Sequence, residues 1–259
     1  MRNEILERLD KKSCDLHTHT CFCDGKDTPE DMVVSAIRKG LSCIGILHHS
    51  TVSFDRECSI SEEDVPRFKA EIRRLREKYK DKILVLCGIE TDCYTTFCEE
   101  GYDYIIGSAH YLKIGKEYLP IDLSRESLVR IANEKFDGDF FALADEYYRL
   151  VSEIKNKCNA DIVGHFDLIT KFNKDNSLFN TADERYLSAA KAAARRLTDD
   201  GLLFEINTGA ISRGYTDEPY PKSELYSYLR TLGADFILSS DAHQKENVAY
   251  KFESFSQLI

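Results

Sequence analysis

The chain contains 259 residues, of which 42% are hydrophobic and 31% are charged, a composition that fits one ordinary globular domain with enough apolar material for a closed core. Its 35 basic and 45 acidic residues give a net charge of −10, which disfavours a nucleic-acid partner because the sequence contains no local basic run. No stretch approaches the roughly 18 apolar residues of a membrane span, and nine cysteines without a C-x-x-C pair or a secretion signal favour reduced thiols in the cytoplasm.

Short β-like runs alternate with longer helical patterns along the whole chain. The seven predicted strands cover residues 14–19, 42–47, 83–89, 104–108, 161–164, 202–206 and 236–239. Helices are predicted between them, over residues 28–40, 65–79, 142–157, 181–197 and 223–232. Because strands that alternate with helices pair in parallel through right-handed crossovers, we expect a single α/β domain over residues 1–259.

Local signals mark the ends of several of these helices. Thr28 and Pro29 are typical of a helix start, and Gly40 is typical of a helix end. The pattern Thr181-x-x-Glu184 predicts that the hydroxyl of Thr181 caps the helix that follows it.

The seven histidines all fall at, or just after, the ends of predicted strands. They are His17, His19, His48, His49, His110, His165 and His243. Glu90 and Asp241 occupy the same kind of position, and in a parallel barrel these strand ends converge on one face. A lone histidine in a loop is usually a polar surface residue, but chance rarely places all of them at strand ends. Imidazole and carboxylate together suit zinc, iron or manganese, so the sequence predicts a metal centre.

Six ordered motifs between about residues 13 and 245 resemble those of the polymerase-and-histidinol-phosphatase (PHP) superfamily. They lie at 15–20 together with 23–25, and at 44–49, 88–90, 107–110, 164–168 and 240–243. Within the superfamily, the segments at 164–172 and 205–209, followed by Arg213-Gly214 and Tyr220-Pro221, are typical of the histidinol-phosphatase branch. The resemblance implies a distorted seven-stranded (β/α)7 barrel, which agrees with the seven strands predicted independently.

The resemblance also implies two to three divalent metal ions, expected to be zinc, iron or manganese. Carried over by position, the first ion would take His17, His19, Glu90 and Asp241. The second would share Glu90 and add His110 and His165. The third would take Asp24, His49 and His243.

Further residues receive roles that depend on the resemblance. Arg213 matches a basic position near the phosphate, where a guanidinium fork suits two oxygens, although it could be an exposed loop arginine. Asp167 or His243 is expected to protonate the leaving group, and Asn207 to form a polar wall of the pocket or to support a ligand. His48 replaces the aspartate usual in the family, so it either approaches the metal and the substrate or is a spectator.

The function implied is that of a phosphoric monoester hydrolase that converts histidinol phosphate to histidinol and phosphate in histidine biosynthesis. Its partner would be a small phosphate ester, with neither nucleic acid nor membrane. One alternative is a PHP-type phosphodiesterase or nuclease, which would need a basic groove or stacking aromatic residues, and neither is evident. The other is a metal-binding module without catalysis, for which His48 is the only argument.

Overall fold

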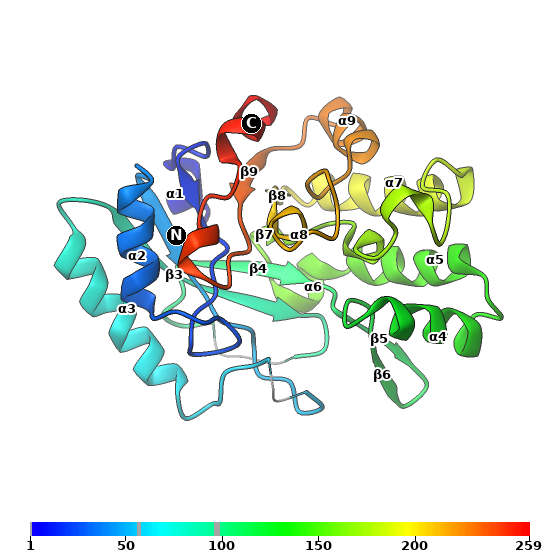
Figure 1. Ribbon diagram of the computed structural model, residues 1–259, viewed down its shortest axis with the longest axis horizontal. Coiled ribbons are helices and arrows are strands. Elements are labelled where there is room, and N and C mark those ends of the chain that lie inside the picture. Colours follow the sequence, from blue (N-terminus) through cyan, green and yellow to red (C-terminus); the bar gives the residue numbers. More distant parts are fainter. Residues whose placement is uncertain (1, 56–57, 96–98) are drawn as a thin grey trace.

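The computed structural model describes residues 2–55, 58–95 and 99–259, and it contains a seven-stranded parallel sheet that curves into a barrel (Figure 1). In sheet order the strands are β1 (Cys14–Asp15), β2 (Cys43–Ile46), β3 (Leu84–Asp92), β4 (Tyr104–Ser108), β7 (Ile162–Val163), β8 (Leu203–Asn207) and β9 (Phe236–Ser239). Beyond β9, Ala242 pairs in parallel with Thr18, and the N–H of His19 donates to the carbonyl of Ala242 at 2.8 Å. These bonds join the last strand to the first and nearly close the barrel.

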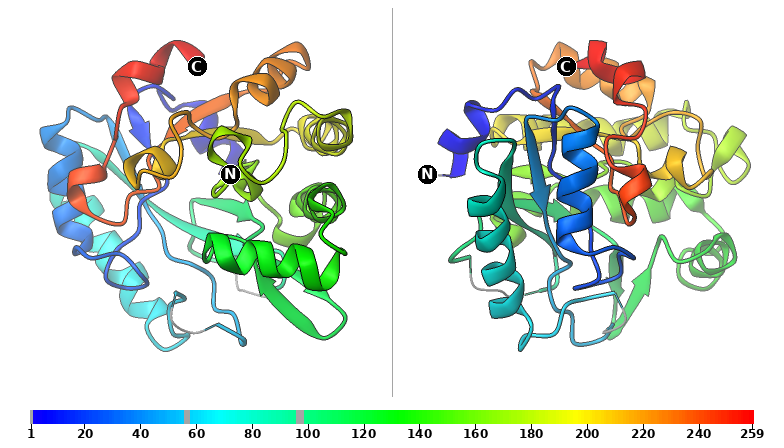
Figure 2. Two further views of the ribbon diagram at one scale, coloured as in Figure 1. Left: turned by 45° about the vertical axis from the view of Figure 1, so that its right-hand side comes forward. Right: turned by 60° about the vertical axis from the view of Figure 1, so that its left-hand side comes forward.

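Helices cover the barrel on two sides. The α-helices are α1 (Arg2–Glu7), α2 (Pro29–Arg38), α3 (Val65–Tyr79), α4 (Arg125–Lys135), α5 (Phe140–Val151), α6 (Ile154–Cys158), α7 (Glu184–Asp199), α8 (Gly209–Ser212), α9 (Ser223–Thr231) and α10 (Phe252–Phe255). Short 3₁₀ turns lie at Leu168–Thr170, Lys174–Asn176, Lys245–Asn247 and Ser256–Leu258. Helices α2 and α3 flank one side, and α4, α5 and α7 the other (Figures 1 and 2).

The predicted fold class and the seven parallel strands are confirmed, with two strands at their predicted bounds. The first strand is shorter than predicted, because regular pairing ends at Asp15 and the chain runs on to His19 with a single further bridge. The predicted helix 142–157 is two helices, α5 and α6. An antiparallel hairpin of β5 (Tyr111–Ile114) and β6 (Glu117–Pro120) was not predicted, nor was α4.

The helix cap predicted at Thr181 is wrong. The cap of α7 is Asp183, whose carboxylate accepts from the N–H of Arg185 at 2.9 Å. The hydroxyl of Thr181 donates instead to Asn176 at 3.1 Å, because the chain before α7 folds back on itself. A cap two residues closer to the helix satisfies the same first-turn donors.

Among the described residues, no helix combines the length and the apolar character needed to cross a membrane. Eight cysteines are described and all are free thiols, and Cys98 lies outside the described residues.

The barrel interior is apolar at its base and polar at the carboxyl ends of the strands. Leu86 and Glu90 lie four residues apart on β3, so both point into the barrel. Leu86 belongs to a cluster centred on Tyr104, whose hydroxyl donates to the carbonyl of Leu16. A Cβ at Gly88 would lie 2.3 Å from Cζ of Tyr104, so glycine is required where the tyrosine ring crosses β3. The apolar base thus supports the polar end.

We predict that Gly88→Ala destabilises the protein by about 1–3 kcal/mol, because the new methyl group overpacks the barrel against the Tyr104 ring. Urea unfolding followed by circular dichroism measures the change. The same substitution in a Tyr104→Ala background should cost much less, since the clashing ring is gone. An equal loss in both backgrounds would contradict this account of the packing.

Candidate metal centre

The centre of the site is the carboxylate of Glu90, which is 1% exposed at the end of β3. Its Oε2 lies 3.1 Å from Nε2 of His17, 3.3 Å from Nε2 of His19 and 3.2 Å from Nδ1 of His49. The sequence argument expected both residues of His17-x-His19 on one side of the chain, and both imidazoles do face Glu90. His49 joins them because it pairs with Glu90 as an extension of the β2–β3 ladder.

The other oxygen of Glu90 faces a second pair of histidines. Its Oε1 lies 3.3 Å from Nε2 of His110 and 3.0 Å from Nε2 of His165, and it accepts a hydrogen bond from the hydroxyl of Ser108 at 2.6 Å. His110 follows β4 and His165 follows β7, the next two strands in the sheet. One carboxylate therefore bridges two groups of imidazoles from opposite sides of the barrel mouth.

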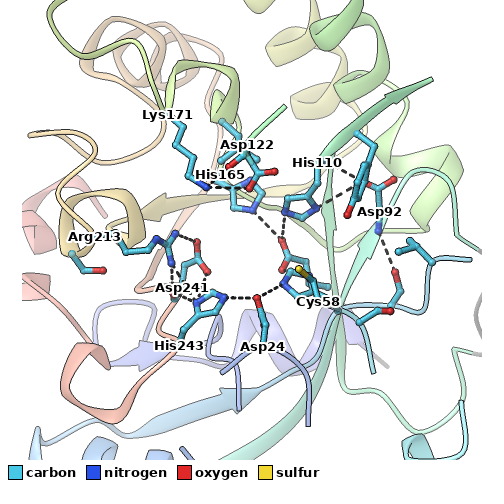
Figure 3. A pocket seen from close by; sticks show the side chains of 18 of the residues that line it. Asp24, Cys58, Asp92, His110, Asp122, His165, Lys171, Arg213, Asp241 and His243 are labelled. Carbon is cyan, nitrogen blue, oxygen red and sulfur yellow. Dashed lines mark hydrogen bonds and ion pairs between the residues drawn. The ribbon is translucent and has the colours of Figure 1, made fainter. Parts of the chain in front are cut away.

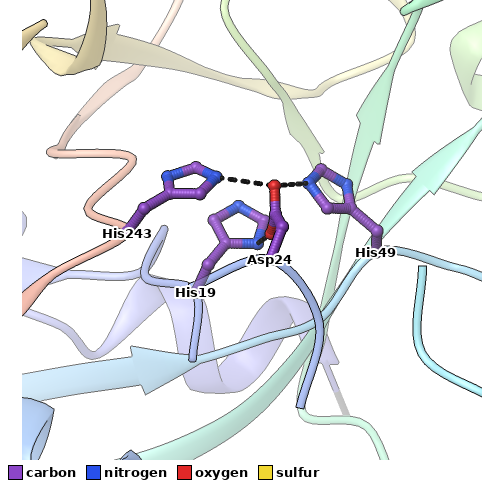
Figure 4. Close-up of side chains that lie close together, drawn as sticks. All are labelled: His19, Asp24, His49 and His243. Atoms are coloured by element: carbon purple, nitrogen blue, oxygen red, sulfur yellow. Dashed lines mark hydrogen bonds and ion pairs between the residues drawn. The ribbon is translucent and has the colours of Figure 1, made fainter. Parts of the chain in front are cut away.

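Asp24 gathers a further group at the outer edge of the cluster (Figure 4). Its Oδ2 lies 3.1 Å from Nε2 of His243 and 3.6 Å from Nε2 of His49. The ring of His19 stacks between those two imidazoles, with centroids 4.3 Å and 4.4 Å away. The loop after β1 thus brings a carboxylate to histidines that come from β2 and β9.

Asp241 completes the cluster and holds the predicted arginine. Its Oδ1 lies 3.7 Å from Nε2 of both His17 and His19, and its Oδ2 accepts from Arg213 at 2.8 Å. Its φ is +50°, a left-handed conformation that turns the chain sharply after β9. A Cβ at Gly209 would meet the carboxylate of Asp241 at 2.8 Å, so glycine is needed for this approach.

The donor set fits divalent cations. Four overlapping groups have ligand atoms within 4.8 Å of one another: His17, Glu90 and His165; His17, His19 and Asp241; His49, Glu90 and His110; and His19, Asp24, His49 and His243. All nine ligands predicted from the resemblance belong to these groups. The grouping of these ligands differs from the three predicted ion sites. His19 also lies with the Asp24 group, and His49 also lies with Glu90 and His110.

The orientation of the His17 ring supports this fit. Glu205 accepts a hydrogen bond from Nδ1 of His17 at 2.7 Å, so Nε2 is the ring nitrogen that faces the cluster. Nε2 of His17 lies 3.1 Å from Oε2 of Glu90 and 3.1 Å from Nε2 of His19. Electron-pair donors converge here, which is the arrangement that a metal ion satisfies.

Strong electrostatic coupling runs through the cluster. Burial raises the pKa of Glu90, but His17 and His49 lower it more, so the pKa lies well below its ordinary value. Burial lowers the pKa of His17, but Glu205 and Glu90 raise it well above normal. Burial, with the neighbouring His243 and His49, lowers the pKa of His19 to about 3. Carboxylate charge therefore dominates the Glu90 side, which favours a bound cation.

A cavity of about 430 Å³ opens directly above the cluster (Figure 3). Among the residues that line it are Asp24, His49, Glu90, His110, His165, Asp241 and His243, with Lys26, Asp92, Tyr111, Asp122, Lys171 and Arg213 around them. Arg213 was predicted at this position, and the structure places it there with its guanidinium directed at Asp241 (Figure 3).

Glu205 and Asn207 support the cluster from behind. Besides His17, Glu205 accepts from the main-chain N–H of His165 at 2.9 Å and from Nδ2 of Asn207 at 2.9 Å. Asn207 is fully buried and also accepts from the N–H of Gly209, so it does not line the cavity. Of the two roles predicted for Asn207, the geometry gives it support of a ligand rather than a wall of the pocket.

The predicted approach of His48 to the substrate is corrected. His48 and His49 are consecutive in an extended segment, so their side chains point to opposite sides. His48 is 1% exposed, with Nε2 2.8 Å from the hydroxyl of Tyr102 and its ring edge-on to Phe68 of α3. It packs behind the strand and not in the cavity.

The two candidates for the proton donor, His243 and Asp167, differ in their access to the cavity. His243 lines the cavity, whereas Asp167 does not. Asp167 is fully buried, and its Oδ2 accepts from the main-chain N–H of Lys222 at 3.0 Å. Burial raises the pKa of Asp167 to about 7.

Asp92, Asp122 and Lys171 are among the polar residues of the cavity that sequence reasoning missed. Asp92 accepts from the N–H of His110 at 2.9 Å, and its position two residues after Glu90 on one strand was a usable signal. Lys171 lies inside a motif quoted for the resemblance, but no role was drawn from it. Asp122 follows the unpredicted β5–β6 hairpin, so no pattern placed it near the site.

Known proteins resemble this chain over most of its length. The PHP domain family model matches residues 15–209. A relative named "Probable histidinol-phosphatase" from Deinococcus radiodurans is 28% identical over 250 residues, covering 92% of this chain and 89% of the relative. The histidinol-phosphatase of Bacillus subtilis is 24% identical over 265 residues, covering 93% and 97%.

A solved structure shares the fold. Histidinol phosphate phosphatase from Lactococcus lactis, complexed with zinc, L-histidinol and phosphate, superposes with a TM-score of 0.74 at 23% identity, covering 96% of this chain and 92% of that one.

We predict that Glu205→Gln weakens metal binding about 10- to 100-fold, because the neutral amide no longer fixes the tautomer and the basicity of His17. Competition with a chromogenic chelator measures the affinity directly. Glu224→Gln on the exposed face of α9 is the control and should bind metal as the wild type does. Unchanged affinity in the Glu205 variant would contradict the proposed support.

Proposed function

The chain belongs to the PHP domain family, and on that premise we propose that it is a metal-dependent phosphomonoesterase whose substrate is L-histidinol phosphate. The observation that carries the proposal is the carboxylate of Glu90, which bridges two groups of imidazoles at the floor of a cavity with basic side chains on its walls. The relatives named as histidinol-phosphatases, which align over nine-tenths of the chain, support the choice of substrate. The reaction places the protein in histidine synthesis.

Two to three divalent ions would occupy the cluster. Glu90 would be shared between His17, His19 and Asp241 on one side and His110 and His165 on the other, and Asp24, His49 and His243 would hold the third ion. Zinc accompanies L-histidinol and phosphate in the Lactococcus lactis protein, and iron and manganese suit the same donor types. Such ions would supply a nucleophile from water at neutral pH and would neutralise charge on the phosphate.

The side chains of the cavity walls orient the substrate. Arg213 directly follows α8 and Lys171 lies in the segment after β7, and both present N–H donors to the cavity that suit phosphate oxygens (Figure 3). Arg213 donates to both the carbonyl and the carboxylate of Asp241, which holds its guanidinium plane at the edge of the cluster. We assign His243 to the metal site, because its ligand atom lies with those of His19, Asp24 and His49 within 4.8 Å of one another.

The alternatives gain no specific support from the described residues. The diesterase would need a basic groove or a row of stacking aromatic residues, whereas the site is a cavity of about 430 Å³ with acidic and basic groups intermixed. The non-catalytic module depended on His48, which packs against α3 away from the metal cluster.

The first test measures phosphate release from L-histidinol phosphate, a dinucleotide diester and several sugar phosphates, after metal removal and reloading with zinc, manganese or iron. We expect no activity in the stripped protein and a strong, metal-dependent preference for L-histidinol phosphate. Cleavage of the diester alone would rule out the phosphatase and keep the metal centre. Inactivity with every metal would favour the binding module.

We predict that Arg213→Met lowers kcat/KM about 100- to 1000-fold, because it removes a preorganised charge beside the phosphate. Steady-state kinetics measures this, and metal analysis shows whether Asp241 still holds its ion. Arg213→Lys should recover part of the loss, since it keeps the charge but not the fork. Arg195→Met, which removes a hydrogen bond from an exposed arginine to Tyr228, is the surface control. A wild-type kcat/KM in Arg213→Met would exclude the phosphate role.

A further inference from the structure

Five carboxylates of the described residues line the cavity, and one of them stands apart from the metal centre. The five are Asp24, Glu90, Asp92, Asp122 and Asp241. Three of these belong to the metal cluster. Asp92 is engaged by the main chain, since Oδ2 accepts from the N–H of His110 at 2.9 Å and Oδ1 accepts from that of Tyr94 at 3.1 Å. Asp122 remains as a carboxylate with no part in either network.

Among the described residues, Asp122 forms one ion pair, with Lys171. Nζ of Lys171 donates to the carbonyl oxygen of Asp122 at 2.7 Å and lies 3.2 Å from its Oδ2. Among the described residues, Oδ1 of Asp122 accepts no hydrogen bond. The side chain is 27% exposed and lies beside His165 at the cavity wall (Figure 3). Asp122 therefore presents a charged, incompletely satisfied acceptor to whatever occupies the cavity.

A substrate phosphate would weaken the ion pair between Lys171 and Asp122. Lys171 lines the same cavity, so a phosphate dianion seated over the metal cluster competes with Oδ2 of Asp122 for its ammonium group. The main-chain carbonyl bond to Lys171 does not require the carboxylate. When Lys171 turns to phosphate, the partly buried carboxylate of Asp122 loses its counter-charge and needs another cation.

We propose that Asp122 is a specificity-determining residue that binds the ammonium group of the substrate alcohol, an inference that rests on the proposed phosphomonoesterase function. Phosphate and ammonium then replace the internal Lys171–Asp122 pair with two ion pairs between protein and substrate. An ester without an ammonium group leaves the partly buried Asp122 carboxylate without a cationic partner, so it is disfavoured. Discrimination of this kind is strong, because a substrate that lacks the ammonium group leaves a polar group of the site without a partner.

The test compares L-histidinol phosphate with its analogue in which a hydroxyl group replaces the ammonium group, using the metal-loaded full chain. In Asp122→Asn, kcat/KM for L-histidinol phosphate should fall about tenfold or more, the size expected for one lost charge-assisted hydrogen bond. For the hydroxyl analogue, kcat/KM should fall less than twofold. Asp122→Glu should retain much of the discrimination. Asp217→Asn, which removes an exposed ion pair with Lys174, should leave both values unchanged.

Other outcomes overturn the proposal. Equal losses on both esters would show that Asp122 only anchors Lys171, and no loss on either would show that it is not in contact with substrate. If Asp122→Asn does not fold, the wild type decides, because equal kcat/KM values for the two esters exclude recognition of the ammonium group. A wild type that hydrolyses neither ester refutes the proposed function itself, which is a distinct result.

Discussion

The constraint on which the site depends is the burial of the Glu90 carboxylate at the mouth of the barrel. A carboxylate removed from water is costly unless both oxygens are paired, and here each oxygen faces imidazole nitrogens within 3.3 Å. Those imidazoles come from the ends of several neighbouring strands, so the strand order of the sheet is also the order of the ligands. The barrel must close for Glu90 to be satisfied, and metal ions bound there would provide further countercharge.

Two layers behind the cluster make it rigid. Glu205 ties His17 to the main chain of His165, which joins β1, β8 and β7 beneath the ligands. Below that, Tyr104 spans the interior and hydrogen-bonds to the carbonyl of Leu16. The small residues Gly45 and Gly88 leave room for its ring, since a Cβ at either would fall within 2.4 Å of the tyrosine. The apolar base fixes the strands, and the strands fix the ligands.

Much of this was readable from the sequence because strand ends are where chemistry concentrates in a parallel barrel. Eight of the nine ligands stood at such positions, Asp24 was assigned from the family resemblance alone, and the side chains of all nine do converge. For His48 the sequence analysis left both a site role and a spectator role open, although alternation along an extended chain places only His49 inside. Asp122 escaped notice because it follows a hairpin whose four-residue strands are too short and too exposed to give a clear pattern. The predicted cap at Thr181 failed because a local hydrogen bond to Asn176, in the turn that precedes α7, uses its hydroxyl.

The central claim is that the Glu90 carboxylate bridges metal ions, and anomalous X-ray diffraction from crystals of the zinc- or manganese-loaded protein tests it most directly. We expect at least two anomalous peaks, one on each side of Glu90, with carboxylate oxygens at about 2.0–2.2 Å for zinc. The same crystals of Glu90→Gln should lose both peaks or show them much weakened. Peaks that lie away from Glu90, or that keep full occupancy in the variant, would contradict the account.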